Sequence, residues 1–353
     1  MPFFSIIIPC CDVEPYVSEC LDSLLNQPFG DWEALVGVET SKDKTEEIVR
    51  EYAAKDPRFK VFTGPRSGSC SASRNTGTDL AQGEYVIFLD GDDTIEDGSL
   101  QRLHDKIAAR SGADLYPCAI VVHNEMTGKA EELRDNYPAD FSDELTGVDA
   151  TLFLEQRWRH YFPCPMLQLT VFRREFLVKN NLKCIYGLRM QDSEFSPRAL
   201  YLAKRIIPIH EPFYIYRIRE NSVQTKAKGP GYFYKDLAIR LRSLMAFHAA
   251  MSSKQEFDKR VGAAWAKRWI GILFTRWFNP RIVNELPREE RVQSLRIIFP
   301  DDFGDFDKLL NSAPLVQRVA APFVKTFIFR PSMRALAELF FKTIYFPMLA
   351  RLA

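Results

Sequence analysis

Three aspartates stand within four positions of the chain, directly after an apolar run. In the stretch EYVIFLDGDD, residues 84–93, five apolar or aromatic residues are followed by Asp90, Asp92 and Asp93. Carboxylates this close repel one another unless a positive charge lies between them. Two interpretations are open: an acidic turn that caps the next helix, or a site for a divalent cation at the edge of a sheet.

Strand and helix patterns alternate ahead of this acid cluster. Short β-branched or aromatic runs cover residues 3–9, 32–38, 59–64 and 84–90, and helical spacing of apolar residues covers 14–27 and 41–56. This alternation predicts a parallel sheet with helices on both faces. Ligands bind such sheets beyond the carboxyl ends of the strands. Pro9, Glu39 and Asp90 all stand at those ends, which favours the cation site over the helix cap.

The residues near the acid cluster indicate what the cation would bind. Neither a G-x-G-x-x-G loop nor a G-x-x-x-x-G-K-[ST] loop is present. The stretch SGSCSASRNTG, residues 67–77, is rich in small residues and carries Arg74. A Mg²⁺ or Mn²⁺ ion held by few carboxylates completes its shell with substrate phosphates. An acid cluster with an arginine nearby therefore fits a nucleotide diphosphate.

Four blocks of sequence, in their order and spacing, resemble glycosyltransferase family 2, the inverting enzymes with the GT-A fold. The blocks are SIIIPCCDVEPYVSECLDSLLNQ, DWEALVGVETSKDKT, SCSASRNTG and GEYVIFLDGDD. Two later stretches, GLRMQDSEF and AKRIIPIHEPFYIYRIRENS, extend the resemblance to roughly residues 3–225. The resemblance implies an α/β fold: a GT-A-like open, mostly parallel sheet flanked by helices, followed here by a C-terminal helical extension.

The resemblance also implies roles for single residues. It assigns nucleotide binding to Pro9, Glu39, Arg74 and Asp90. Glu39 stands where the family carries a carboxylate that accepts from the uracil ring, so a UDP-sugar is the expected donor. Asp90 and Asp92 match the family's D-x-D pair for Mn²⁺ or Mg²⁺, with Asp92 as the direct ligand.

Asp192 falls where the family places its catalytic base. A carboxylate there would take the proton of the acceptor hydroxyl as its oxygen attacks the anomeric carbon from the face opposite the leaving group. The sugar would then invert its configuration, and the expected acceptor is a glycan or lipid-linked hydroxyl in polysaccharide biosynthesis. Without the resemblance, QDSEF also fits a surface turn that caps the following helix.

Five positions depart from the family pattern, and at one of them Cys11 replaces a tyrosine. Val38 replaces the first of two acids after the second strand, Asp12 and Arg66 replace asparagines, and Gln191 replaces the acid before the base. These departures leave open a non-catalytic module that binds a nucleotide sugar. A nucleotidyltransferase is the other alternative, although PCCDVEPY lacks the basic Gly-rich loop that such an enzyme would need.

The overall composition describes a folded protein of nearly neutral charge. The 353 residues are 46% hydrophobic and 26% charged with a net charge of +1, which gives no reason to expect nucleic-acid binding. The seven cysteines form no CxxC pair and are expected to be reduced thiols. Since the first residues, MPFFSIIIPC, lack a basic leader, we expect a cytoplasmic protein.

The C-terminal part has a different pattern. We expect a glycosyltransferase domain over 1–221, a polar loop or linker over 222–231 and a helical region over 232–353. Residues 314–353 carry six basic residues and one acid, and Arg334, Glu338 and Lys342 form one stripe on an otherwise apolar helix. This helix packs on the body or lies on an anionic membrane surface. The basic excess favours a peripheral position at the inner face of the cell membrane.

Overall fold

The computed structural model describes residues 1–126, 129–134, 144–157, 167–220, 230–279, 287–300 and 303–346. Contacts divide the chain into two units, Met1–Ala150 with Cys164–Lys226 and Thr151–Pro163 with Ala227–Ala353. The expected linker at 222–231 falls almost wholly outside the described residues, as does the tail beyond 346. The expected division differs from the structural one, because a short segment around the end of α5 (Gly147–Arg157) belongs to the second unit.

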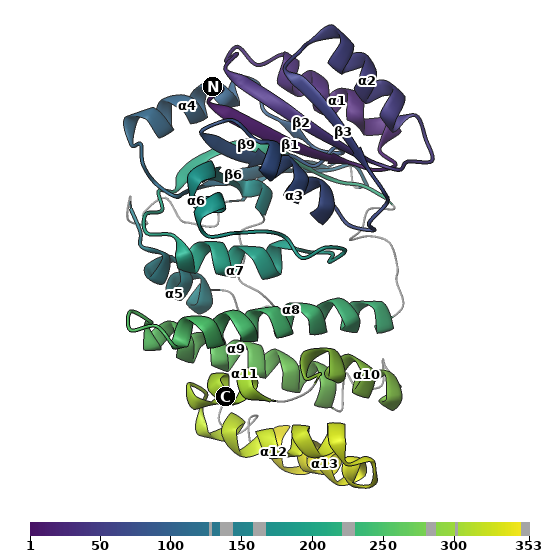
Figure 1. The fold of residues 1–353 in the computed structure, drawn as a ribbon, viewed down its shortest axis with the longest axis vertical. Helices are drawn as coiled ribbons and strands as arrows, with labels where there is room; N and C mark the ends of the chain where they lie inside the picture. The colour runs from purple at the N-terminus through teal and green to yellow at the C-terminus, as the bar shows by residue number, and fades with distance from the viewer. Residues whose placement is uncertain are drawn as a thin grey trace. The chain divides into compact units, whose positions relative to one another are not determined.

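The first unit is built on one mixed sheet (Figure 1). Within the described residues its strand order is β3-β2-β1-β4-β8-β6-β9-β5, and β7 pairs with β6. The pairing is parallel across β3-β2-β1-β4, as expected, and mixed beyond β4, because β8 is antiparallel to both of its neighbours. The strands are β1 (Phe4–Cys10), β2 (Trp32–Glu39), β3 (Phe59–Gly64), β4 (Tyr85–Phe88), β5 (Thr94–Ile95), β6 (Leu115–Asn124), β7 (Lys129–Arg134), β8 (Thr170–Arg173) and β9 (Ile209–Ile218).

Helices cover both faces of this sheet. Side chains alternate along a strand, so Ile6 and Ile8 of β1 join the buried cluster that includes α1, while Ile7 points the other way, toward α3. In α3, a Cβ on Gly77 would lie 2.5 Å from Ile7, so only glycine lets this helix approach so closely. The helices of this unit are α1 (Glu14–Leu25), α2 (Thr45–Lys55), α3 (Ser71–Leu80), α4 (Ser99–Ala109), α6 (Arg174–Lys179) and α7 (Asp192–Leu202).

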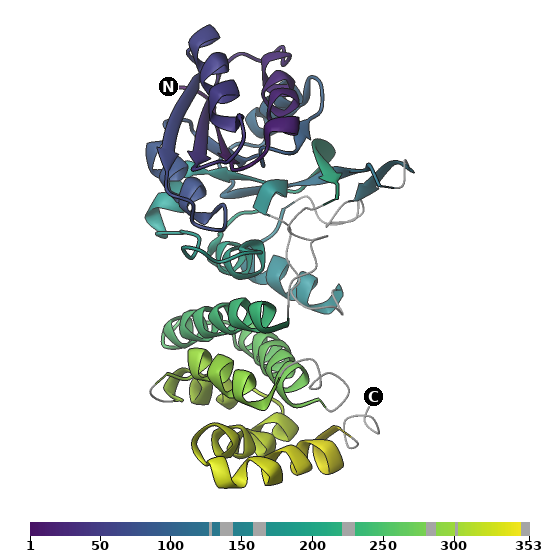
Figure 2. The same cartoon turned by 90° about the vertical axis from the view of Figure 1, so that its right-hand side faces the viewer.

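The second unit is a stack of helices around an aromatic core (Figure 2). Trp265 and Trp269 stack at 4.9 Å, and Trp277 packs edge-on against Tyr234. Arg268 donates to Glu155, which ties the end of α5 into this unit. The helices are α8 (Pro230–Ser252), α9 (Lys259–Phe278), α10 (Arg288–Ile298), α11 (Gly304–Asn311), α12 (Leu315–Phe329) and α13 (Arg334–Phe340), which continues into a π-helical turn at Phe341–Tyr345.

Two expectations about the whole chain bear on these units. Among the described residues, no helix combines the length and the apolar character needed to cross a membrane. The cysteines that the structure describes, six of the seven, are all free thiols, which agrees with the expectation of reduced cysteines.

A buried histidine makes the second unit sensitive to pH. His248 of α8 is fully buried against Phe257 and Trp265. Among the described residues, neither of its ring nitrogens has a hydrogen-bond partner. Burial without a partner penalises the charged imidazolium and lowers the pKa of His248 to about 4. The folded state therefore needs this histidine to be neutral.

We predict that stability falls as this histidine is forced to ionise. The unfolded chain binds the proton near the ordinary histidine pKa and the folded chain binds it near pH 4, so the free energy of unfolding falls as pH drops through this window. From about pH 7.5 to about pH 5 the loss should be roughly 2 kcal/mol. Urea unfolding of the parent and of His248→Leu, followed by tryptophan fluorescence, checks this.

His248→Leu should lack this part of the pH dependence, while His123→Gln, which changes an exposed histidine on β6, serves as the control. Equal pH dependence of the parent and His248→Leu would contradict the assignment.

Candidate active site

The three aspartates lie in the loop between β4 and β5, beyond the carboxyl end of β4. The N–H of Gly91 donates to the Pro9 carbonyl at 3.3 Å, which holds the loop against the end of β1. A Cβ at Gly91 would lie 2.7 Å from the Cys10 sulfur, so this position needs glycine. Strand β5 follows the loop, and the next helix begins only at Ser99. The interpretation of these acids as helix caps is therefore wrong.

Asp90 is held by two protein donors. Nη2 of Arg74 donates to Oδ1 at 2.5 Å, and Nε2 of Gln168 donates to Oδ2 at 2.6 Å. Each oxygen of Asp90 thus accepts one hydrogen bond and keeps a second lone pair. The arrangement orients Arg74 through Asp90 and leaves the expected metal role of Asp90 a prediction.

Arg74 connects the acid loop to the start of α7. It is only 3% exposed, and its Nη1 donates to Oε1 of Gln191 at 3.3 Å. Gln191 immediately precedes Asp192, the expected base. The next residue, Asn75, points elsewhere: its amide donates to the Cys184 carbonyl and accepts from the Cys184 N–H, both at 2.8 Å. Arg74 is thus the member of this motif that faces the acids.

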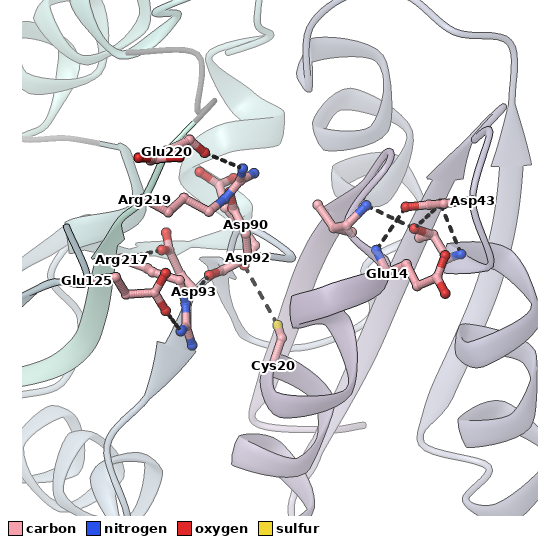
Figure 3. Close-up of polar contacts among 12 residues, drawn as sticks. Glu14, Cys20, Asp43, Asp90, Asp92, Asp93, Glu125, Arg217, Arg219 and Glu220 are labelled. Atoms are coloured by element: carbon pink, nitrogen blue, oxygen red, sulfur yellow. Dashed lines mark hydrogen bonds and ion pairs between the residues drawn. The ribbon is translucent and has the colours of Figure 1, made fainter. Parts of the chain in front are cut away.

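Asp92 pairs with an arginine from the end of β9. Nε and Nη2 of Arg219 both donate to Oδ2 of Asp92, at 3.0 and 2.7 Å (Figure 3). The guanidinium also lies 4.7 Å from the ring centroid of Tyr16. Burial and the nearby Asp90 carboxylate raise the pKa of Asp92, while Arg219 opposes that rise. Arg219 belongs to the stretch YRIRENS, residues 216–222. Its role depends on the return of β9 to the side of the acid loop, and no local sequence pattern indicates that return.

Asp93 has a structural role. Its Oδ2 accepts from the Tyr214 hydroxyl at 2.5 Å and its Oδ1 accepts from the Arg217 N–H at 2.8 Å. The Tyr214 hydroxyl in turn accepts from the Asp90 N–H at 3.2 Å. Burial raises the pKa of Asp93 well above its ordinary value, and the Asp92 and Asp90 carboxylates add to the rise. These bonds fasten β9 to the acid loop, and Figure 3 shows Arg217 beside Asp93.

Asp192 shares its surroundings with the acid loop. It is the first residue of α7, and it is half-buried. Arg74 donates to Asp90 and to Gln191, the residue before Asp192, and so brings the loop after β4 and the start of α7 together. Tyr216 on β9 is half-buried, and burial raises the pKa of its phenol, with further contributions from Asp93, Asp90, Asp92 and Asp192. Sequence reasoning gave Tyr216 no role.

Glu39 lies at the end of β2 and is 4% exposed. Its two carboxylate oxygens accept from the N–H and the hydroxyl of Ser67, at 2.8 and 2.7 Å. A uracil ring would have to share this carboxylate with Ser67. Pro9 pairs with Gly37 of β2 and contributes its carbonyl to the acid loop.

The positions that depart from the family pattern are integrated into the structure. Asp12 has a positive φ of 52°, accepts from the N–H of Lys42 and pairs with Arg66. Gln191 accepts a hydrogen bond from Arg74, and Val38 is buried in β2. Two of the departing side chains, Asp12 and Arg66, thus pair with each other.

The side chains of the site can be compared with the ligands that a divalent cation needs. Within the described residues, no group of three or more histidine, cysteine, aspartate or glutamate side chains has the arrangement of a metal site. Mg²⁺ is commonly bound through one or two carboxylates and the substrate phosphates. Asp92 fits such a site by its chemistry, since its carboxylate lies in the loop beyond the carboxyl end of β4, where a substrate phosphate could complete the shell.

Comparisons with known proteins agree with this architecture. Residues 5–176 match the family model for glycosyl transferase family 2. The uncharacterized glycosyltransferase EpsJ of Bacillus subtilis (strain 168) is 31% identical over 229 residues, 63% of this chain and 63% of EpsJ. The chain thus spans less than two thirds of that relative. The GalNAc(5)-diNAcBac-PP-undecaprenol beta-1,3-glucosyltransferase of Campylobacter jejuni is 26% identical over 272 residues, 73% of this chain and 79% of that protein.

Among solved structures, S. aureus TarS 1-349 in complex with UDP-GlcNAc has a TM-score of 0.67 and covers 93% of this chain and 88% of its own. At 19% identity this likeness shows the fold, and it confirms the expected α/β, GT-A-like class with C-terminal helices. Residues 5–176 therefore form a glycosyltransferase family 2 domain, and the curated relatives support a family 2 glycosyltransferase.

Proposed function

We propose that this protein is an inverting glycosyltransferase that moves a sugar from a nucleotide diphosphate, in our proposal UDP, to a hydroxyl of a glycan or lipid-linked acceptor. One observation supports this most: the buried Arg74 donates to Asp90 of the acid loop and to Gln191, the residue before Asp192, and so joins two distant parts of the chain at one site. The Campylobacter relative is named for a lipid-linked glycan, and the TarS structure contains UDP-GlcNAc. We place the reaction in the cytoplasm, since the described cysteines are free thiols.

Each residue in the proposed mechanism has one task. A Mn²⁺ or Mg²⁺ ion at Asp92 would neutralise the charge that develops on the leaving diphosphate. Arg74, fixed by Asp90, supplies positive charge beside the nucleotide. Asp192 takes the acceptor proton while the acceptor oxygen attacks from the opposite face, so the anomeric configuration inverts without a covalent intermediate.

The pairing of Asp92 with Arg219 has a consequence for cation binding. In the structure, Arg219 occupies one oxygen of the carboxylate that we assign to the metal. A cation that binds Asp92 through that oxygen must therefore displace Arg219. The guanidinium of Arg219 balances part of the charge of Asp92.

We predict that Asp92→Asn abolishes metal-dependent binding of UDP. The substitution keeps the shape of the side chain and removes its charge, so the affinity for UDP in Mn²⁺ should fall at least about tenfold, the equivalent of roughly 1.4 kcal/mol. Calorimetric titration of UDP with and without a chelator measures this.

Asp97→Asn is the matched control, since it removes an exposed carboxylate just beyond β5. Both variants should melt near the parent temperature. Unchanged UDP affinity in Asp92→Asn would contradict the assignment of the metal to Asp92.

We predict that Asp192→Asn binds the donor normally but transfers poorly. General-base help is worth ~10²–10⁴ in rate, so turnover should fall by about 10² or more while the affinity for UDP changes little. UDP release from a panel of UDP-sugars with an added acceptor, together with UDP titration, separates the two effects.

Asp149→Asn is the control, because it also removes an aspartate from the first turn of a helix. The alternatives predict other results. A non-catalytic module would bind UDP and release none from UDP-sugars, and a nucleotidyltransferase would release pyrophosphate. Turnover of Asp192→Asn within a few-fold of the parent would place the base elsewhere.

A further inference from the structure

The charged stripe of the last helix faces inward. Arg334 is 8% exposed and donates to the Phe327 carbonyl and to Glu289. Glu338 accepts from Arg288 and Arg291 of α10. Two of the three charges in the expected stripe therefore hold α13 to the rest of its own unit. The helix does pack on its unit, as one expectation had it, but it does so through its charges.

The inner faces of α12 and α13 share one support. Phe327 of α12 packs on Phe278 of α9 at 5.1 Å, and Phe341, just after α13, stacks on the same ring at 4.3 Å. The two helices also touch each other, since Phe323 and Phe340 stack at 3.6 Å. Because both helices rest on α9, their opposite faces both point away from it, and Figure 2 shows them as the outermost layer of this unit.

The outer face of these helices is apolar. Among the described residues, six of the thirteen exposed large hydrophobic side chains lie on this short stretch. Contiguous exposed apolar surface of this kind marks a site of interaction with a protein or a membrane. The six are Leu315, Val319, Met333, Leu336, Leu339 and Ile344, which are 67, 55, 38, 50, 52 and 53% exposed.

The exposed charges on and just beyond α12 and α13 that have no ion-pair partner among the described residues are all positive. Arg318, Arg330 and Lys342 are exposed, and the described residues offer none of them an ion-pair partner. The acid of the stretch, Glu338, is used by Arg288 and Arg291. Exposed apolar side chains next to unpaired basic side chains complement a surface that has anionic groups on the outside and an apolar layer beneath them.

We propose that the outer face of α12 and α13 docks on an anionic lipid bilayer. The six apolar side chains enter the interface, and Arg318, Arg330 and Lys342 contact the headgroups. The helices lie along the surface and do not cross it, in keeping with the lack of a spanning helix among the described residues. A protein partner would need acidic groups around an apolar patch, whereas an anionic bilayer presents this arrangement everywhere. The proposal is independent of the catalytic assignment.

Vesicle co-sedimentation of the full chain tests the proposal. Vesicles of phosphatidylcholine alone are compared with vesicles that also contain phosphatidylglycerol, at low and at high salt. The parent should bind the anionic vesicles at least about tenfold more tightly, and salt should weaken this binding. The variant R318Q/R330Q/K342Q should lose the anionic preference, and L336E/L339E should lose binding to both kinds of vesicle.

Two checks separate docking from damage to the fold. Val178→Glu places the same charge at a 62% exposed apolar position on α6 and should bind vesicles like the parent. Melting curves confirm that all variants fold. Negligible binding of the parent to either vesicle, or equal binding of the parent and L336E/L339E, would overturn the proposal. The parent could instead form dimers and bind no vesicle, while L336E/L339E is monomeric. This result would overturn the proposal and would assign the face to a second copy of the chain.

Discussion

The candidate site depends on one buried guanidinium. Arg74 is almost fully removed from water and donates to Asp90 on one side and to Gln191 on the other. A buried charge is tolerated only when it is paired and hydrogen-bonded. Since its partners come from the loop after β4 and from the start of α7, the chain satisfies Arg74 only by bringing these two segments together. The position of Asp192 follows from this constraint.

Strand β9 completes the site from the other side. Its Tyr214 donates to Asp93, and Arg219, just beyond its end, pairs with Asp92. Three aspartates at adjacent positions thus have three different environments: Asp90 is held by Arg74, Asp92 by Arg219 and Asp93 by Tyr214. The three carboxylates that looked unfavourable together in the sequence are thus paired with side chains from α3 and from β9 and its end.

The residues at the ends of the first strands could be predicted from the sequence. The residues that reach the site from distant parts of the chain could not. The alternation of strands and helices placed Pro9, Glu39 and Asp90 at one edge of the sheet, as found. The roles of Gln168 and Arg219 could not be predicted, because these residues reach the acids only through the mixed half of the sheet, far along the chain. The C-terminal helix shows the same limit. Its periodicity located a stripe, but it could not tell which side of the helix the rest of the unit would cover.

The segment from Arg74 to Gly77 contains residues that support the fold as well as a residue of the candidate site. Arg74 faces the acids, whereas Asn75 pins α3 to Cys184 and Gly77 lets the helix lie against Ile7. Two of these three residues therefore serve the assembly of the fold. A protein that had lost its catalytic carboxylate would still need both of them in order to fold. The presence of this motif is consequently a sign of shared ancestry and architecture, and a survey that seeks active members of the family should weigh Arg74 and the residues that it touches.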